Sequence, residues 1–387
     1  MINVLELFGG IGACTKALKR SGIDFDIADY VEIDKYAVKS YNAINGTNFT
    51  PQDIRNWDKD INVDLIMHGS PCQDFSLAGK QRGADEGSGT RSSLMYETIR
   101  IVEKLKPKYV IWENVKNVLS QKHIHNFNKY LNYMQSFGYR NYYKVLNSKD
   151  YGIPQNRKRI FVVSILGDET FMFPKTIKLD KKLKDLLEDK VDEKYYLSDE
   201  QLSKGYLGNA VNKNLKDCFN RENCLINKEI AYTITTKPDR RIGDCNFVTD
   251  DKVEMTVKQF LEIKENTKKG YKEAYIFDSV NLDYPTSKTR RGRVGNQVAN
   301  TLTTSCNQGV VSNDMRLRKL TPLESWRLMG FDDEDFYKAE KINSNTQLYK
   351  QAGNSIVVNV LEEILKNIFL CENEYSCYVQ TTIFDYK

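Results

Sequence analysis

The chain has 387 residues, of which 40% are hydrophobic and 28% are charged, a composition typical of a folded globular protein. No apolar run approaches membrane-spanning length and the first residues include no basic, cleavable leader, so we expect a cytoplasmic protein without a membrane partner. The eight cysteines form no Cys-x-x-Cys pair and there are only three histidines. This composition argues against a zinc cluster and favours a reducing compartment.

Basic residues are clustered more than the modest net charge of +5 suggests. They gather at residues 157–159, 240–241, 288–293 and 316–319. Clusters of this kind predict a polyanionic partner.

The first motif combines a strand, a glycine turn and a helix. Residues 4–8 are strand-like and lead into Gly9, Gly10 and Gly12, after which a helical pattern ends at Gly22. This is the pattern of a nucleotide-binding unit, in which glycines let a ligand approach backbone N–H groups. The third glycine position of the dinucleotide fingerprint is Thr15, which argues against a pyrophosphate cofactor.

Two acidic residues follow at strand ends. Residues 27–31 predict a second strand that ends at Glu32, where a ribose diol is bound in such folds, although a solvated acid is the plainer alternative. Asp53 lies near the third strand position. From the residues alone, an acceptor for an adenine amino group and an ordinary turn aspartate are equally good interpretations.

Cys72 follows a short apolar strand, residues 64–67, that Pro71 ends. Ligands bind outside the carboxyl ends of strands in open α/β sheets, so Cys72 is a candidate nucleophile, with a small buried residue as the alternative. Residues 73–92 are rich in glycine and predict a mobile lid. Glu113 ends the strand 108–112 and is expected at the same sheet edge.

The rest of the chain divides at Gly167, where the alternation of strands and helices stops. Before it, helices are predicted at 94–105 and 125–137, followed by a strand pair around residues 155–159. Beyond it, residues 180–194 predict either a charged helix or a hinge. Further predicted helices cover 322–329, capped by Thr321, and 356–369, opened by Gly353-Asn354-Ser355.

A series of short motifs in this order resembles the DNA (cytosine-5) methyltransferases over residues 2–370. They are Phe8-Gly9-Gly10-Ile11-Gly12, Pro71-Cys72-Gln73, Glu113-Asn114-Val115, Gln155 to Arg159, Arg318 to Pro322, and Gly353-Asn354-Ser355. The resemblance implies a doubly wound, Rossmann-like α/β catalytic domain at 1–167 and a smaller strand-rich target-recognition domain at 168–315. The segment 316–387 then returns to the catalytic domain.

The resemblance also implies S-adenosyl-L-methionine as methyl donor, with S-adenosyl-L-homocysteine as product. The residues expected to bind it are Phe8, Gly9, Gly10, Ile11, Gly12, Glu32, Ile33, Asp53, Ile54, Pro71, Leu94, Asn354 and Ser355. The catalytic residues implied are Cys72, which adds to C6 of a flipped-out cytosine, Glu113 at N3 and the exocyclic amine, Arg159 on the O2 side, and Arg157. For Arg157 we expect either a phosphate contact or a role in positioning the loop, and for both arginines phosphate binding alone is the alternative. No metal is expected.

Double-stranded DNA is the implied partner of a monomer encoded by a bacterium or phage, and a separately acting restriction endonuclease is a candidate second partner. The residues expected to contact DNA are Gln73, Ser76, Arg240, Arg241, Arg290, Arg291, Thr301, Leu302 and Thr303. A tRNA-directed relative shares these motifs but has a more compact recognition region. A non-catalytic DNA-binding protein on a degenerate scaffold is disfavoured because Cys72, Glu113 and Arg159 are all present.

Overall fold

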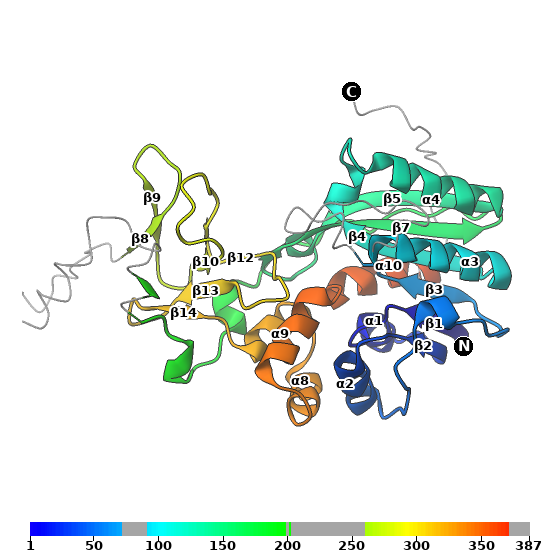
Figure 1. Ribbon diagram of the computed structural model, residues 1–387, viewed down its shortest axis with the longest axis horizontal. Coiled ribbons are helices and arrows are strands. Elements are labelled where there is room, and N and C mark those ends of the chain that lie inside the picture. The colour runs from blue at the N-terminus through cyan, green and yellow to red at the C-terminus, as the bar shows by residue number, and fades with distance from the viewer. Residues whose placement is uncertain (72–90, 199–200, 203–259, 371–387) are drawn as a thin grey trace, which may run out of the picture. The chain divides into compact units, whose positions relative to one another are not determined.

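A computed structural model describes residues 1–71, 91–198, 201–202 and 260–370 of the chain. Its contacts divide the chain into two compact units (Figure 1). Unit 1 contains the described residues within 1–153, 157–180 and 326–387, and unit 2 those within 154–156 and 181–325. Cys72, Gln73, Ser76, Arg240 and Arg241 lie outside the described residues.

Unit 1 is built on a six-stranded sheet with the order β2-β1-β3-β4-β7-β5. The strands are β1 (Ile2–Leu7), β2 (Phe25–Val31), β3 (Leu65–His68), β4 (Tyr109–Val115), β5 (Tyr139–Asn147) and β7 (Lys158–Leu166). The first four are parallel, and β7 runs antiparallel to both of its neighbours. In register, Leu7 pairs with His68 and His68 with Trp112, so the carboxyl ends of β1, β3 and β4 lie at one edge. The predicted Rossmann-like fold is confirmed.

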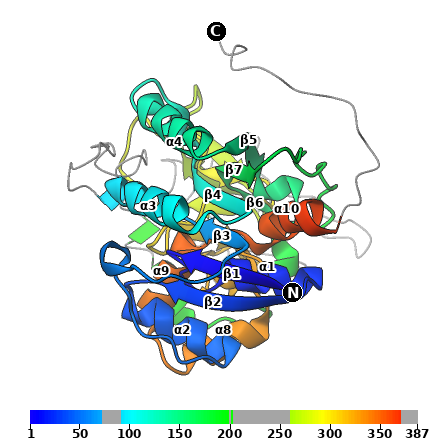
Figure 2. The ribbon, with the colours of Figure 1, turned by 90° about the vertical axis from the view of Figure 1, so that its right-hand side faces the viewer.

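Helices cover both faces of this sheet: α3 and α4 lie on one side, and α1 packs beside α10 on the other (Figure 2). The helices of unit 1 are α1 (Ala13–Ser21), α2 (Lys35–Asn45), α3 (Met95–Leu105), α4 (Ile124–Ser136), α8 (Asp333–Glu340), α9 (Asn345–Asn354) and α10 (Val358–Phe369). Left-handed glycines bound α1 at each end, Gly12 with φ 85° and Gly22 with φ 68°. Glycine adopts this conformation without the steric cost that a Cβ atom imposes, which explains why the sequence predicts these ends.

The strands β3 and β4 are apolar in sequence because they pack in the core beneath α3 and α4. Alternate residues of the strands, such as Leu5, Ile66 and Trp112, pack against Met95 and Val102 of α3. Each of these five side chains is fully buried. The polar residues that end the strands are thereby held at fixed positions along the edge.

Unit 2 is strand-rich, with a four-stranded antiparallel sheet of order β11-β10-β13-β14, the hairpin β8-β9 and the short parallel pair β12-β6. Its strands are β6 (Gln155–Asn156), β8 (Leu261–Lys264), β9 (Tyr271–Ala274), β10 (Ser279–Asn281), β11 (Val294–Gly295), β12 (Ala299–Asn300), β13 (Gln308–Val311) and β14 (Leu317–Lys319). Helix α7 (Pro322–Arg327) follows β14. The predicted cap of α7 is confirmed, because the Glu324 N–H donates to Thr321 Oγ1 at 3.2 Å.

The charged helix predicted as one alternative at 180–194 is wrong. The structure has only 3₁₀ turns there, at Leu183–Leu186 and Glu193–Tyr195. Backbone N–H groups of this segment bond outside it, Leu183 to the Gln297 carbonyl and Glu188 to Glu324 Oε1. These tertiary hydrogen bonds replace the intrahelical ones that the local spacing of leucines predicts.

Candidate active site

The glycine loop between β1 and α1 is held by hydrogen bonds to Glu32 and Tyr30. Phe8, Gly10 and Gly12 all have positive φ, at 54°, 55° and 85°. The Gly10 N–H donates to Glu32 Oε2 at 3.1 Å, and the Gly10 carbonyl accepts from the Tyr30 hydroxyl at 2.5 Å. A Cβ atom on Gly10 would meet nothing within 4 Å, so this face of the loop has room for a ligand.

Glu32 directly follows the last residue of β2 and lies beside this loop, at the strand end that the sequence predicts. Its carboxylate also accepts from the Asp34 N–H at 2.8 Å. Burial raises the pKa of Glu32, while the hydrogen bonds from Asp34 and Gly10 oppose the rise. The next residue, Ile33, is 63% exposed and offers a free apolar surface next to the acid.

Three other predicted cofactor residues lie in the connections before β3 and α3. Asp53 accepts from the Arg55 N–H and guanidinium, which lower its pKa, and it caps the turn Ile54–Asn56. The Ile54 side chain is 4% exposed and packs in the core, so only its backbone is available to a ligand. Leu94, before α3, is half-buried against the same core.

The chain that leads from β3 to Cys72 is tied to β4. Trp112 Nε1 donates to Ser70 Oγ at 3.0 Å, and Asn114 Nδ2 donates to the Ser70 carbonyl at 3.2 Å. A Cβ atom on Gly69 would lie 3.8 Å from Glu113 Oε2. Glu113 therefore lies beside the segment that ends, within the described residues, at Pro71.

Glu113 forms an ion pair with Arg159, in which Nε lies 3.0 Å from Oε1. The carboxyl is almost fully buried, and this burial raises its pKa, while the charges of Arg159 and Arg157 oppose the rise. Arg157 is 3% exposed, and its Nη2 donates to the carbonyls of Gly353 at 3.0 Å and Ser355 at 2.8 Å. The Arg157 guanidinium is thus engaged in holding a turn, which corresponds to the positioning alternative.

That turn joins α9 to α10. The helix predicted at 356–369 is confirmed to within two residues as α10, but Gly353-Asn354-Ser355 also ends the helix before it, which the sequence did not predict. Asn354 is the last residue of α9, Ser355 is extended with ψ 158°, and α10 begins at Val358. The Ser355 N–H bonds to the carbonyls of Gln351 and Ala352, which closes α9. The motif is therefore a junction between two helices.

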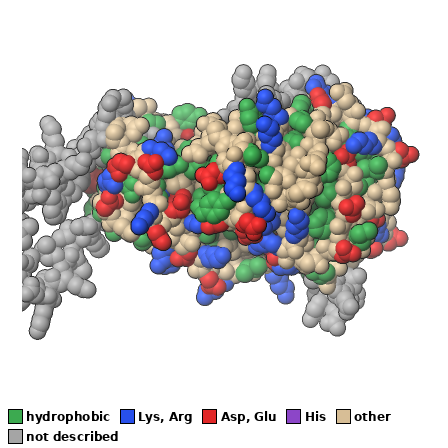
Figure 3. Space-filling view, turned by 90° about the horizontal axis from the view of Figure 1, so that it is seen from below, with side chains coloured by type: hydrophobic (Ala, Val, Ile, Leu, Met, Phe, Trp, Pro, Cys, Tyr) green, Lys and Arg blue, Asp and Glu red, His purple; other side chains and the backbone are tan. Residues whose placement is uncertain are grey.

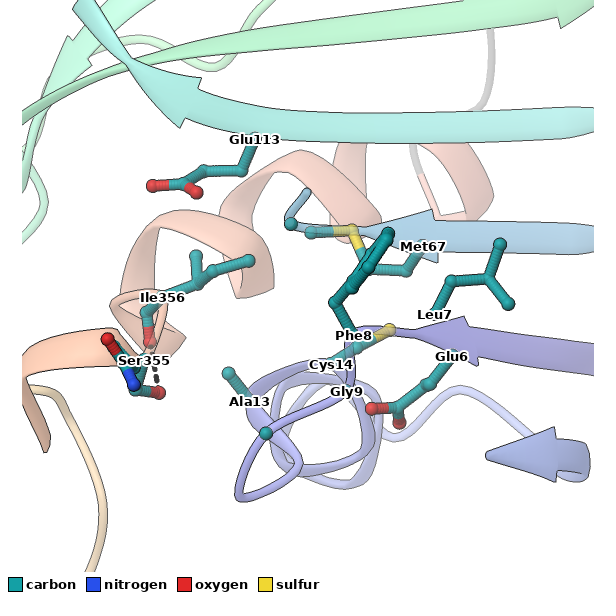
Figure 4. Close-up of a pocket in the computed structure, with 13 residues that line it drawn as sticks. Glu6, Leu7, Phe8, Gly9, Ala13, Cys14, Met67, Glu113, Ser355 and Ile356 are labelled. Atoms are coloured by element: carbon teal, nitrogen blue, oxygen red, sulfur yellow. Dashed lines mark hydrogen bonds between the residues drawn. The ribbon is translucent and has the colours of Figure 1, made fainter. Parts of the chain in front are cut away.

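A pocket in unit 1 brings several of these elements together (Figure 4). Its lining consists of Glu6, Leu7, Phe8, Gly9, Gly10, Ala13, Cys14, Met67, Gly69, Glu113, Asn354, Ser355 and Ile356. In Figure 4, Glu113 extends from β4 across from Ile356 and Ser355, while Phe8 and Gly9 lie at the end of β1. Six of these positions, Phe8, Gly9, Gly10, Glu113, Asn354 and Ser355, are among the predicted site residues, and the other lining residues, including Glu6, Cys14 and Ile356, are not.

Glu6 is the missed residue with the most unusual environment. It is 1% exposed, and its Oε1 accepts from the Thr15 N–H at 2.9 Å and from the Thr15 hydroxyl. Burial raises its pKa to about 7. The signal in the sequence was an acid inside an otherwise apolar strand, Val4-Leu5-Glu6-Leu7.

Two further basic clusters each contain one arginine that is internal, which weakens the argument from clustering to a polyanion. Arg293 is 1% exposed and donates to the carbonyls of Asn281, Asp283 and Tyr284. Arg318 is buried in a two-bond ion pair with Glu324. On the face drawn in Figure 3, lysine and arginine side chains are mixed with acidic ones.

The predicted DNA-contacting residues in the described part of unit 2 differ in exposure. Arg291 is exposed, and Arg290 is half-buried with its guanidinium 5.6 Å from the Tyr284 ring centre. Thr301 donates from its hydroxyl to the Asn156 carbonyl at 2.9 Å, and the Leu302 side chain is 6% exposed. Thr303 is half-buried and bonds to Ser305.

A family model described as C-5 cytosine-specific DNA methylase matches residues 2–370. The chain belongs to this family. It is accordingly a DNA (cytosine-5) methyltransferase, an enzyme that uses a methyl donor and acts on DNA. Among the described residues, no helix is long and apolar enough to cross a membrane, and no cluster of histidine, cysteine and acidic side chains is arranged to bind a metal.

Curated relatives match over nearly the whole methyltransferase chain. It is 32% identical to the type II methyltransferase M2.ScrFI of Lactococcus lactis subsp. cremoris, covering 95% of this chain and 99% of the relative. It is 31% identical to the orphan methyltransferase M.SPRI of Bacillus phage SPR, covering 95% and 97%. The crystal structure of a Spodoptera frugiperda DNMT2 mutant shares the fold at 20% identity, with a TM-score of 0.60 over 95% of this chain and all of that one.

Proposed function

We propose that this methyltransferase transfers the methyl group of S-adenosyl-L-methionine to C5 of a flipped-out cytosine in duplex DNA, through a covalent bond between Cys72 and C6. The observation that supports this most directly is the pair Glu113–Arg159, buried at the sheet edge next to Gly69. Glu113 also lines the pocket beside the glycine loop. One site would thus contain both the group that activates the base and the residues that hold the methyl donor.

The residues present fit an adenosyl group. Gly10 has open space where a Cβ would be, and the Glu32 carboxylate and the exposed Ile33 lie beside it. Glu32 would accept from the ribose hydroxyls and Ile33 would pack on the adenine, with Asp53 near its amino group. Asn354 and Ser355 would lie at the methionine end. When bound, S-adenosyl-L-methionine supplies an electrophilic methyl group and leaves as S-adenosyl-L-homocysteine.

Cytosine C5 is a weak nucleophile, so the protein must first activate the ring. The Cys72 thiolate would form a bond to C6, and the displaced electron pair would move toward N3. Glu113, whose pKa is raised by burial, can hold a proton at N3 and stabilise this charge. After C5 has gained the methyl group, loss of the C5 proton to a base would expel Cys72 and restore the ring.

Arg159 and Arg157 would have different tasks in this reaction. Arg159 would hold Glu113 in place and face the O2 side of the base. Arg157, engaged with the carbonyls of Gly353 and Ser355, would be a positioning residue that fixes the junction of α9 and α10. Its replacement would therefore disturb donor binding as well as the reaction.

We further propose that residues 168–315 form a target-recognition domain, within which most of unit 2 lies. A base inside a duplex cannot reach a buried carboxyl, and extruding it costs a few kcal/mol, about what a small number of protein–DNA contacts supply. Gln73, Ser76, Arg240, Arg241, Arg290, Arg291, Thr301, Leu302 and Thr303 would supply them. The names of the relatives suggest either a restriction-modification system, with a separately acting endonuclease, or an orphan phage enzyme. We propose a cytoplasmic monomer in either setting.

The covalent mechanism is tested by trapping. Duplex DNA that contains 5-fluorocytosine cannot lose a C5 proton, so the wild-type protein and S-adenosyl-L-methionine should form an adduct that survives denaturing electrophoresis. Cys72→Ser should form none, although it should still bind S-adenosyl-L-homocysteine. Bisulfite sequencing of DNA from cells that express the chain would supply the target site. An adduct with Cys72→Ser would refute the assignment of the nucleophile.

A further inference from the structure

The glycine loop has one position where glycine is required by a neighbour rather than by its own backbone. A Cβ atom on Gly9 would lie 2.5 Å from Tyr30 Cε2 and 2.7 Å from Cδ2, both closer than real contacts allow. Gly9 has no positive φ, in contrast to Gly10 and Gly12. The space that an alanine methyl would need at this position is therefore filled by the ring of Tyr30.

Tyr30 cannot move aside, because its ring is packed from behind. It is fully buried and stacks on Tyr41 with 3.9 Å between ring centres, and Phe49 packs against both rings. The Tyr41 ring in turn lies 2.9 Å from where a Cβ of Gly12 would be. Each tyrosine thus occupies the side-chain space of one glycine.

Hydrogen bonds connect Tyr30 to the loop and Tyr41 to the first turn of α1, directly after the loop. The Tyr30 hydroxyl donates to the Gly10 carbonyl at 2.5 Å, opposite the bond from the Gly10 N–H to Glu32. The Tyr41 hydroxyl lies 2.9 Å from Thr15 Oγ1, and Thr15 bonds to Glu6 below the loop. The peptide groups on both sides of Gly10 are therefore oriented by the side chains of Tyr30 in β2 and of Glu32 just after it.

We propose that Tyr30 and Tyr41, which we call the tyrosine floor, are positioning residues that set the shape of the glycine loop for the methyl donor. The proposal rests on the proposed role of that loop in binding S-adenosyl-L-methionine. It adds a requirement that the motif alone does not contain, namely that Gly9 and Tyr30 must be chosen together. A residue larger than glycine at 9 is compatible only with a smaller one at 30.

The hydrogen bond is tested with Tyr30→Phe in the full chain, by calorimetric titration with S-adenosyl-L-homocysteine. Loss of one hydrogen bond should weaken binding roughly fivefold. The KM for S-adenosyl-L-methionine should rise by a similar factor, with kcat at saturating donor unchanged. Tyr130→Phe is the matched control, because Tyr130 is equally buried and its hydroxyl contacts His68 at 3.1 Å, away from the loop. Tyr130→Phe should lower the free energy of unfolding without changing the affinity for S-adenosyl-L-homocysteine or the KM for S-adenosyl-L-methionine.

The steric pairing is tested with a double-mutant cycle. Gly9→Ala alone should weaken binding about tenfold or more, because the added methyl overlaps the ring. In a Tyr30→Val background the same change should cost less than about twofold, since the ring is gone. The proposal would be overturned if Gly9→Ala lowered the affinity for S-adenosyl-L-homocysteine equally in both backgrounds, or if Tyr30→Phe left this affinity unchanged. If Tyr30→Val does not fold, the measurement on Tyr30→Phe still tests the proposal. Failure of the folded wild type to bind S-adenosyl-L-homocysteine would instead refute the proposed donor site.

Discussion

Glu6 should make the stability of unit 1 depend on pH. Its carboxyl is 1% exposed, and burial raises its pKa from 4.5 to about 7 despite the hydrogen bonds from Thr15 and the charge of Lys19. Between these two values the folded protein binds more protons than the unfolded chain. The free energy of unfolding should therefore fall as the pH rises through this window and level off above it.

The size of the effect follows from the shift in pKa. A shift of one unit corresponds to about 1.4 kcal/mol, so the rise at Glu6 corresponds to a loss of about 3 kcal/mol between pH 4.5 and pH 8. Glu6→Gln keeps an oxygen that can accept from Thr15 but cannot be charged. The difference in unfolding free energy between Glu6→Gln and the wild type should therefore move by about 3 kcal/mol in favour of the variant as the pH rises.

Tryptophan fluorescence is a suitable probe for this measurement. The three tryptophans of the chain, Trp57, Trp112 and Trp326, are all buried in unit 1. Urea unfolding of both proteins at pH 4.5 and pH 8 gives the difference directly. Glu103→Gln, on the exposed side of α3, is the control and should show no such trend. A difference between Glu6→Gln and the wild type that is the same at both pH values would refute the reasoning.

Four further results are expected. Glu113→Gln should bind DNA and S-adenosyl-L-homocysteine but turn over far more slowly, because it cannot hold a proton at N3; an unchanged single-turnover rate with tritiated donor would show that Glu113 is structural. Glu32→Ala should weaken S-adenosyl-L-homocysteine binding by about 1–3 kcal/mol, the range for a hydrogen bond to a charged group, and calorimetry should detect it. Arg290→Ala should weaken binding to every DNA duplex and flatten the salt dependence of that binding. Arg293→Ala removes the donor to three backbone carbonyls, so it should make unit 2 more sensitive to limited proteolysis. A changed site preference with an unchanged salt slope for Arg290→Ala would contradict the phosphate role.

Local patterns in the sequence predicted the class of fold of unit 1 and several of its elements, but not α2, α8 or α9. Glycines that must adopt positive φ mark both ends of α1, and the apolar run at β3 predicts a strand buried on both faces. These signals depend on residues close together in the chain, so they can be interpreted without knowing the fold. The same holds for the position of Glu113, since strand ends in a parallel sheet meet at one edge. Its role, like that of Cys72, stays a prediction.

Only the tertiary structure decided what the charged and aromatic side chains do. A long arginine can reach solvent, a phosphate or a carbonyl, and Arg157 reaches a carbonyl 196 residues away in the chain. Tyr30 and Gly9 belong to different strand ends, and their fit is visible only when β1 and β2 are paired. The sequence therefore determined the order of the motifs and many, but not all, of the elements. Packing between distant segments decided which polar groups face a ligand and which face the protein. The reason is that a charge or a donor can be buried without a large cost only where it has a hydrogen-bond or ion-pair partner.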